Sequence, residues 1–242
     1  HSINIDAMME TLNRVPAGDV VLLHGCCHNP TGADLQPEHW DQIADIALER
    51  GFIPFIDIAY QGLGQGLDAD AYGLRMMADR LPELLVASSC SKNFGLYRER
   101  TGSITLVAES AEQAKIVSAQ SMSIARQIYS MPPAHGALLV SLILGDDQLR
   151  ANWQAELEEV RLRIKAMRTL LTDGINDNAA GMDFSHIKQQ QGMFSFLGIT
   201  SDQLNRLRDE FAIYIVGSTR VNLAGINSTN IDYLTQSIRT VL

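Results

Sequence analysis

Basic residues, cysteines and long apolar runs are all scarce in this sequence. Lys and Arg number 19 against 28 Asp and Glu, a formal net charge of −9, so no domain-wide basic field can neutralise phosphates and nucleic acid is not expected as a partner. Three cysteines, two of them adjacent at Cys26 and Cys27, make no plausible disulfide framework and indicate a reducing compartment. No apolar run is long enough to span a bilayer and no signal peptide opens the chain, so we expect a cytoplasmic protein without membrane contact that acts on small molecules.

The remaining composition is that of a globular chain. Of the 242 residues, 46% are hydrophobic and 19% charged, which fits one or two domains with a sizeable core. The first residue is His1 rather than methionine, and amphipathic sequence follows at once. We therefore expect that the beginning of the protein is missing.

The first part of the chain alternates between short apolar runs and amphipathic segments. The pattern predicts strands at 20–23, 52–57, 84–87 and 102–107, and helices at 5–12, 37–50 and 68–81. This alternation is typical of an α/β fold, with a mostly parallel sheet and helices on its faces.

The pattern changes after residue 107. Helices are predicted at 111–129, 134–144, 146–171 and 202–211 and from 231 to the end, and short strands at 193–197, 213–215 and 221–223. The helix that begins at residue 146 has its apolar positions on one side and could bridge two domains. We therefore predict a larger domain in residues 1–145, and the bridging helix with a smaller α+β domain in 146–242.

Lys92 lies in the polar loop after the strand at 84–87, at the end of the strand where open α/β sheets place their ligands. Two serines precede it and Arg100 follows eight residues later. An amine, a hydroxyl and a guanidinium together suit a cofactor with an aldehyde and a phosphate, and pyridoxal phosphate is the obvious candidate. The alternative is an ordinary surface lysine in a polar loop.

Asp57 ends an apolar strand, where a carboxylate is costly to bury without a positive partner. It could therefore pair with the ring nitrogen of such a cofactor. Tyr60, three residues on, and Asn29, after the neighbouring strand, could both hydrogen-bond the phenolic oxygen of the ring. The alternatives are a capping aspartate, a packed aromatic residue and a turn-forming asparagine.

His24, Cys26, Cys27 and His28 could suggest a metal site. Tetrahedral zinc sites usually draw ligands from separate elements, and adjacent cysteines on a strand point to opposite faces. We therefore expect no metal at this position.

Six motifs, in order and at family-like spacing over essentially the whole chain, resemble the aspartate/aromatic aminotransferase branch of the fold type I pyridoxal phosphate enzymes. They are HNPTG at 28–32, DIAYQG at 57–62, SCSKNFGLY at 89–97, YSMPPAHG at 129–136, GMFSF at 192–196 and STRVN at 218–222. The resemblance implies the large domain of that fold, incomplete at its N-terminus, followed by the small domain.

The resemblance also implies roles for individual residues. Lys92 would form the imine with pyridoxal phosphate and move the proton at the substrate α-carbon. The cofactor would be held by Asp57 at the pyridine nitrogen, by Tyr60 and Asn29 at the phenolic oxygen, and by Ser89 and Arg100 at the phosphate. Arg220 would bind the substrate α-carboxylate in a bidentate way, a task that suits guanidinium better than ammonium.

A homodimer with shared active sites is implied as well, because Arg126 resembles the arginine that reaches into the neighbouring subunit and binds an acidic side chain. The expected reaction exchanges an amino group between aspartate or aromatic amino acids and 2-oxoglutarate. Met131 stands where the family usually has asparagine, and its apolar side chain could favour aromatic substrates.

Family members are longer, and the part absent here resembles the N-terminal segment, with the helix N-terminus that binds the cofactor phosphate. We therefore expect an uncovered sheet edge and an inactive fragment. Two alternatives remain open: an effector-sensing, non-catalytic domain of a transcription regulator, or a lyase or decarboxylase of the same fold.

Overall fold

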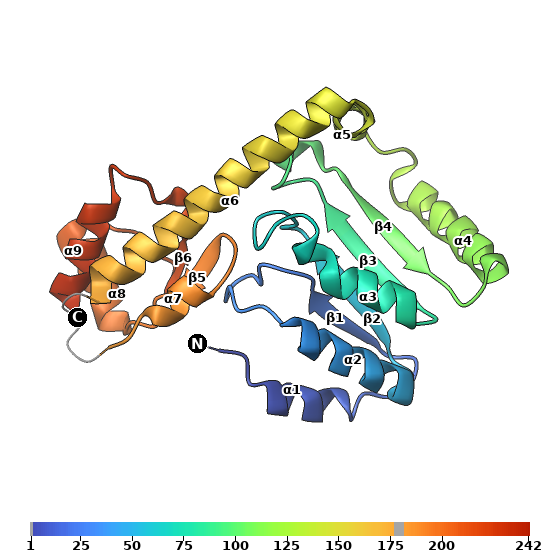
Figure 1. The fold of residues 1–242 in the computed structure, drawn as a ribbon, viewed down its shortest axis with the longest axis horizontal. Coiled ribbons are helices and arrows are strands. Elements are labelled where there is room, and N and C mark those ends of the chain that lie inside the picture. The colour runs from blue at the N-terminus through green and yellow to red at the C-terminus, as the bar shows by residue number, and fades with distance from the viewer. Residues whose placement is uncertain (1, 177–181) are drawn as a thin grey trace.

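The computed structural model describes residues 2–176 and 182–242 and contains two sheets that lie beside the two ends of one long helix (Figure 1). The larger sheet consists of β1 (Val20–His24), β2 (Ile53–Ile58), β3 (Leu84–Ser89) and β4 (Gly102–Val107). These strands are neighbours in chain order, with β1, β2 and β3 parallel and β4 antiparallel to β3. The expected mostly parallel sheet is confirmed.

Two helices cover one face of this sheet, α2 (Pro37–Arg50) and α3 (Tyr72–Arg80), and the 3₁₀ turn η1 (Ala69–Ala71) leads into α3. Proline suits the first turn of α2, and Gly51, with φ +74°, ends that helix. The two helices approach closely because Gly73 has no side chain: a Cβ there would lie 2.4 Å from the Trp40 ring. Between the helices and the sheet lies an apolar core that includes Leu23, Ile43, Ile56, Met77 and Val86.

The opposite face of the sheet differs from the expectation that helices flank both faces. Val20, Leu22 and Ile104 are 53%, 58% and 63% exposed, and the register places Leu22 and Ile104 on the side that faces away from α2 and α3. Alternation along a strand sends every second side chain to this face, so its apolar residues stay exposed where the described chain packs no helix on it.

The other helices outside the smaller sheet are α1 (Ile5–Leu12), the 3₁₀ turn η2 (Tyr97–Glu99), α4 (Ala111–Tyr129) and α5 (His135–Gly145). The long helix α6 (Asp147–Asn176) then runs from α5, beside the larger sheet, to the C-terminal part of the chain (Figure 1). Its buried residues Leu157, Ile164, Met167 and Leu171 recur at helical spacing. Among the described residues, we find no helix with the length and apolar character needed to cross a membrane.

The smaller sheet pairs β5 (Phe194–Phe196) with β6 (Arg220–Asn222) in antiparallel fashion. Around it lie α7 (Ser185–Gln189), α8 (Ser201–Phe211), η3 (Leu223–Gly225) and α9 (Ile231–Val241). The α9 helix packs on both α6 and α8. The boundary between the two domains at residues 145 and 146 stays a prediction.

Residues 213–215 do not form the predicted strand. The left-handed Ala212, with φ +52°, ends α8, and the Ile213 N–H then bonds back to the Leu207 carbonyl instead of to a neighbouring strand. Ile213 and Ile215 still pack against the core while Tyr214 is 80% exposed. The alternating pattern therefore reports burial on one side of an extended segment without sheet pairing.

Candidate active site

Lys92, Asp57, Asn29 and Tyr60 line one cavity of about 130 Å³. They come from the segments that follow or end β1, β2 and β3, where the carboxyl ends of three parallel strands meet. The cavity also borders His24, Cys26 and Ala59. The sequence prediction that these four polar residues converge is thus consistent with their placement.

Tyr60 lies at the centre of the polar contacts. The Asn29 Nδ2 donates a hydrogen bond to the Tyr60 hydroxyl at 3.3 Å, and the Lys92 Nζ lies 4.6 Å from the centroid of the Tyr60 ring. Burial raises the pKa of the Tyr60 phenol, and the hydrogen bond from Asn29 lowers it in part. The phenol therefore stays protonated at neutral pH and can donate a hydrogen bond into the cavity.

Arg220 reaches the same cluster from the smaller sheet. Its Nη1 donates to the Asn29 Oδ1 at 3.3 Å, across 191 residues of sequence. Phe194 supports it from the neighbouring strand, since the guanidinium carbon lies 4.8 Å from the centroid of the Phe194 ring and that ring stands edge-on to Tyr60 at 6.3 Å. A guanidinium fixed beside Asn29, which itself borders the cavity with Lys92, is suited to holding the carboxylate of an amino acid.

Asp57 and His24 are register partners on β2 and β1, and both border the cavity. The His24 ring lies 4.5 Å from the ring of His28, and its Nδ1 accepts a hydrogen bond from the Asn29 N–H. Burial and the neighbouring His24 both lower the pKa of His28. Beside His24, which borders the cavity, His28 therefore favours a neutral imidazole.

Ser89 and Arg100 lie outside the lining of this cavity, on the two sides of the β3–β4 connection. Ser89 is opposite Gly102 in the register, and the Ser89 Oγ accepts a hydrogen bond from the Ser91 N–H at 3.1 Å. Arg100 is exposed and left-handed, with φ +52°, and its Nη1 donates to the Tyr97 carbonyl. Their predicted role in phosphate binding stays a prediction.

Arg126 is exposed on α4, the helix beside β4 at the edge of the sheet (Figure 1). Met131 follows the same helix and is 75% exposed. The structure therefore does not bring Arg126 to Lys92 within one chain. The predicted action of Arg126 in a neighbouring subunit stays a prediction.

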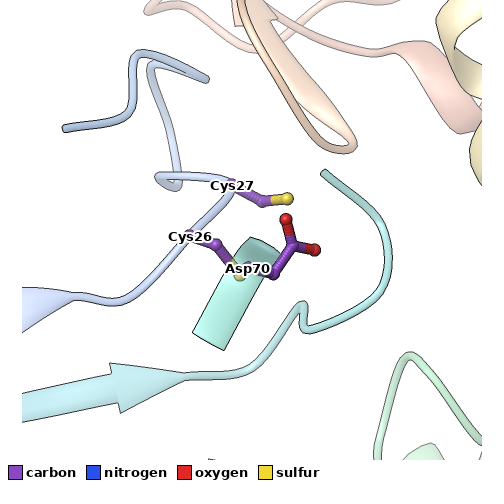
Figure 2. A group of neighbouring side chains, drawn as sticks. All are labelled: Cys26, Cys27 and Asp70. Atoms are coloured by element: carbon purple, nitrogen blue, oxygen red, sulfur yellow. The ribbon is translucent and has the colours of Figure 1, made fainter. Parts of the chain in front are cut away.

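Cys26, Cys27 and Asp70 form a compact cluster (Figure 2), with one ligand atom from each within 4.8 Å of the others. The expectation that the two cysteines point to opposite faces is wrong, because β1 ends at His24 and Cys27 takes a left-handed conformation with φ +51°. Cys27 is 1% exposed, and its pKa is raised by the Cys26 thiol and by burial, which opposes the thiolate that a metal requires.

The Asp70 carboxylate in this cluster accepts hydrogen bonds from the backbone N–H groups of Gly62, Gly64 and Gln65 at 2.7–3.0 Å. These bonds use both of its oxygens, so Asp70 holds the glycine-rich loop after β2 in place. Gly64 permits this, because a Cβ there would lie 2.6 Å from the Asp70 Oδ1. We therefore interpret the cluster as a loop anchor rather than as a metal site.

Sequence reasoning missed three residues that support the site. Phe194 lies in the GMFSF motif at 192–196, but the sequence assigned it no role. Trp153 and Arg168 lie in α6, for which the sequence indicated only a one-sided apolar pattern. Trp153 donates to the Asn93 carbonyl beside Lys92, and Arg168 donates to carbonyls around β5. The signal that the sequence offers for Arg168 is its spacing, four residues after Ile164 and three before Leu171, which places a charged residue on the apolar side of the helix.

A family model described as aminotransferase class I and II matches residues 1–238. The chain is 53% identical to an aspartate aminotransferase of Haemophilus influenzae, with 100% of this chain and 61% of that protein covered. It is 46% identical to an aromatic-amino-acid aminotransferase of Pseudomonas aeruginosa, covering 99% and 60%. A crystal structure of the aromatic-amino-acid aminotransferase from Burkholderia pseudomallei, covalently bound to pyridoxal phosphate, superposes with a TM-score of 0.97 at 42% identity, covering 100% and 60%.

Proposed function

This chain belongs to the aminotransferase class I and II family, and on that premise we propose that the full-length protein is a pyridoxal phosphate-dependent aminotransferase for aspartate or aromatic amino acids, with 2-oxoglutarate as the amino acceptor. The observation that carries the proposal is the single cavity lined by Lys92, Asp57, Asn29 and Tyr60. The chain spans 61% and 60% of the lengths of the two curated relatives named above. Both curated relatives named above are aminotransferases, which does not favour a regulator or a lyase.

The side chains in the cavity fit the proposed cofactor. An amine for an aldehyde, a carboxylate for a ring nitrogen, and a phenol and an amide for a ring oxygen border one space. Ser89 and Arg100 would hold the phosphate from the β3–β4 connection. When bound, pyridoxal phosphate supplies the aldehyde that takes up the amino group and the ring that accepts electrons from the substrate α-carbon.

The protein's own residues do the remaining work. Arg220 would bind the substrate α-carboxylate and so fix the orientation of the α-carbon, because a bidentate pair restricts rotation. The Lys92 amine would take the proton from the substrate α-carbon as a base and later donate it again as an acid. Asp57 would supply a negative charge that keeps the ring nitrogen protonated, and the Tyr60 hydroxyl and the Asn29 amide would donate hydrogen bonds to the ring oxygen.

We propose the homodimer as part of this function. On α4 the apolar side chains Ile116, Met122, Ile124 and Ile128 are between 56% and 71% exposed, and Arg126 lies among them in the sequence. An apolar exposed helix of this kind is typical of an interface. Sedimentation of the full-length protein tests it: a monomer at micromolar concentration would contradict the dimer.

The domain boundary and the compartment are proposed on narrower grounds. The larger domain would comprise residues 1–145. The smaller domain, together with α6, would comprise residues 146–242, because β1 to β4 and β5 with β6 form separate sheets.

A cytoplasmic location is supported by three free thiols, at Cys26, Cys27 and Cys90.

Absorption spectroscopy of the full-length protein tests the reaction. We expect a visible band from the Lys92-bound cofactor that disappears with aspartate or phenylalanine and returns with 2-oxoglutarate. Lys92→Ala should abolish the band and the cycle. Lys165→Ala is the matched control, since Lys165 is exposed on α6, and it should behave as the parent. A Lys92→Ala protein that cycles like the parent would refute the mechanism.

Substrate preference is tested at Met131. We propose that its apolar side chain favours aromatic amino acids over aspartate. The ratio of kcat/KM for phenylalanine and aspartate should move toward aspartate in Met131→Asn. An unchanged ratio would remove this part of the proposal.

A further inference from the structure

The loop that carries Lys92 is tied to other elements at the next residue, Asn93. The Trp153 Nε1 donates a hydrogen bond to the Asn93 carbonyl at 2.8 Å, and the Asn93 Nδ2 donates to the Gln61 carbonyl at 3.2 Å. Within the described chain, these are the two hydrogen bonds that join residues 92–96 to elements outside the β3–β4 connection. We call this connection the Trp153–Asn93–Gln61 clamp.

Of the two arms of the clamp, the Trp153 arm is the stronger restraint. Its hydrogen bond is shorter, and the indole also stacks on Phe94 with ring centroids 4.4 Å apart and an angle of 11° between the planes. The Asn93 Oδ1 is buried with no hydrogen-bond partner among the described residues, so burial of this amide offsets part of what its Gln61 bond contributes.

The loop also has space beside it. A cavity of about 300 Å³ is lined by Lys92, Asn93, Phe94 and Trp153 together with α6 residues such as Leu157. Apart from the Phe94–Trp153 stack, close packing therefore does not hold the loop on this side. Directional contacts such as the indole N–H must fix the main chain there.

The position of the main chain matters because the lysine side chain is long and flexible. Four rotatable bonds separate the Lys92 Cα from its amine, so the reach of the amine toward Asp57 and Tyr60 depends on where the loop holds the Cα. A misplacement of about 1 Å in a reacting group costs about a hundredfold in rate.

Trp153 also connects this loop to the substrate arginine. It lies in the first part of α6, and the same helix carries Arg168, whose guanidinium donates to the Phe194 carbonyl on β5. Phe194 supports the Arg220 guanidinium. The helix α6 therefore contacts both the loop of Lys92 and the strand residue that supports Arg220.

We propose that Trp153 is a positioning residue for Lys92, and that its indole N–H holds the Asn93 carbonyl and thereby sets the place of the lysine amine. This role rests on the proposed aminotransferase function. The positioning role requires the hydrogen bond from the Trp153 indole on α6 to the loop. An aromatic ring packed against Phe94 without an N–H would not be sufficient.

The test uses Trp153→Phe in the full-length protein, which keeps an aromatic ring against Phe94 and removes the N–H. The chain has two tryptophans, and Trp40→Phe is the matched control, since Trp40 is 3% exposed and packs on Gly73 under α3. Amide hydrogen exchange of residues 92–96 in the cofactor-free protein should become about fivefold faster in Trp153→Phe and stay unchanged in Trp40→Phe.

Kinetics supply the second measurement. In Trp153→Phe, kcat should fall about tenfold to a hundredfold while KM for the amino acid changes little, because Arg220 is untouched. The pH midpoint of the visible band of the Lys92-bound cofactor should also shift. Phe94→Leu keeps the Asn93 carbonyl and its indole donor, so this variant should retain kcat within about threefold of the parent.

Three results would overturn the proposal. Exchange, kcat and band midpoint like those of the parent in Trp153→Phe would show that the indole N–H holds nothing of consequence. An equal loss in Phe94→Leu would assign the effect to packing, and an equal loss in Trp40→Phe would assign it to general stability. If Trp153→Phe does not fold, the parent decides: residues 92–96 that exchange in the parent as fast as an unstructured peptide would refute the clamp.

The outcome for the proposed function is separate. A parent protein without the visible band or amino-group exchange defeats the aminotransferase function and with it the role of Trp153. A parent that shows both, with a Trp153→Phe variant that matches it in all three measurements, defeats the positioning role alone.

Discussion

Replacing Arg168 by methionine should destabilise the contact between α6 and the smaller sheet. Arg168 is 2% exposed, and its guanidinium makes hydrogen bonds of 2.6–3.1 Å to four backbone carbonyls. The acceptors are Ile187, Gln191, Gly192 and Phe194. Methionine has a similar length and no donor, so it leaves these carbonyls without their partner.

The size of the effect follows from two opposing costs. Burial lowers the pKa of Arg168 well below its ordinary value, to about 10, which corresponds to about 3 kcal/mol spent on burying the charge. An acceptor left unpaired in the interior costs about 1.5 kcal/mol, so four carbonyls cost about 6 kcal/mol together. Because methionine removes the first cost and incurs the second, we expect a net loss of about 3 kcal/mol in the free energy of unfolding of this part.

Urea unfolding of the full-length protein, followed by hydrogen exchange in β5, measures this loss. Arg163→Met is the matched control on the same helix: Arg163 also donates to two carbonyls, of Ala224 and Ile226, but it is exposed and its loss should cost below about 1 kcal/mol. Arg168→Met should also raise KM, since β5 carries Phe194 under Arg220. Equal unfolding free energies for the two variants would refute the reasoning.

Three further predictions follow from the site and its supports. Arg220→Lys should raise KM for amino acids about tenfold to a hundredfold with a smaller change in kcat, because an ammonium cannot form the bidentate pair; steady-state kinetics with an unchanged KM would contradict the carboxylate role. Gly192→Ala should lower the free energy of unfolding, measured in urea, by at least about 2 kcal/mol, because φ is +76° and the new Cβ would lie 2.4 Å from the Cys27 Cβ. A urea midpoint equal to that of the parent would mean that the loop adapts. The pKa of His28 is lowered in the fold by burial and by His24, so the contribution of the neutral imidazole to stability is complete above about pH 6.5 and is lost as the pH falls toward the folded pKa. The His28→Asn variant should therefore lose less unfolding free energy than the parent between about pH 7 and pH 5. Equal losses in the two proteins would show that His28 does not contribute.

The polar residues of the cavity could be predicted because each follows a strong local pattern. Asp57 ends an apolar strand and Lys92 follows another, and parallel strands place their carboxyl ends at one edge of a sheet. Neither inference needs knowledge of distant parts of the chain. The positions of the two strands fix where both residues lie.

The supports of the site could not be predicted in this way. Trp153 lies 60 residues from Asn93, and in the sequence it fits the apolar stripe of α6 as well as any core residue. The hydrogen bond from its N–H to the Asn93 carbonyl can be recognised only in the folded structure, where the loop and the helix are adjacent. The segment at 213–215 failed for a related reason, because alternation shows which side is buried and says nothing about whether a partner strand exists.

The strands β1 to β4 lie side by side in the order in which the ribosome produces them. Each strand therefore finds its neighbour already made, and the sheet with Lys92 can assemble while synthesis continues. Asn29 must wait for Arg220, 191 residues later. A nascent chain stalled shortly before residue 220 would already hold Lys92 in the loop after β3, while the Asn29 side chain would still lack the guanidinium that donates to it in the folded chain.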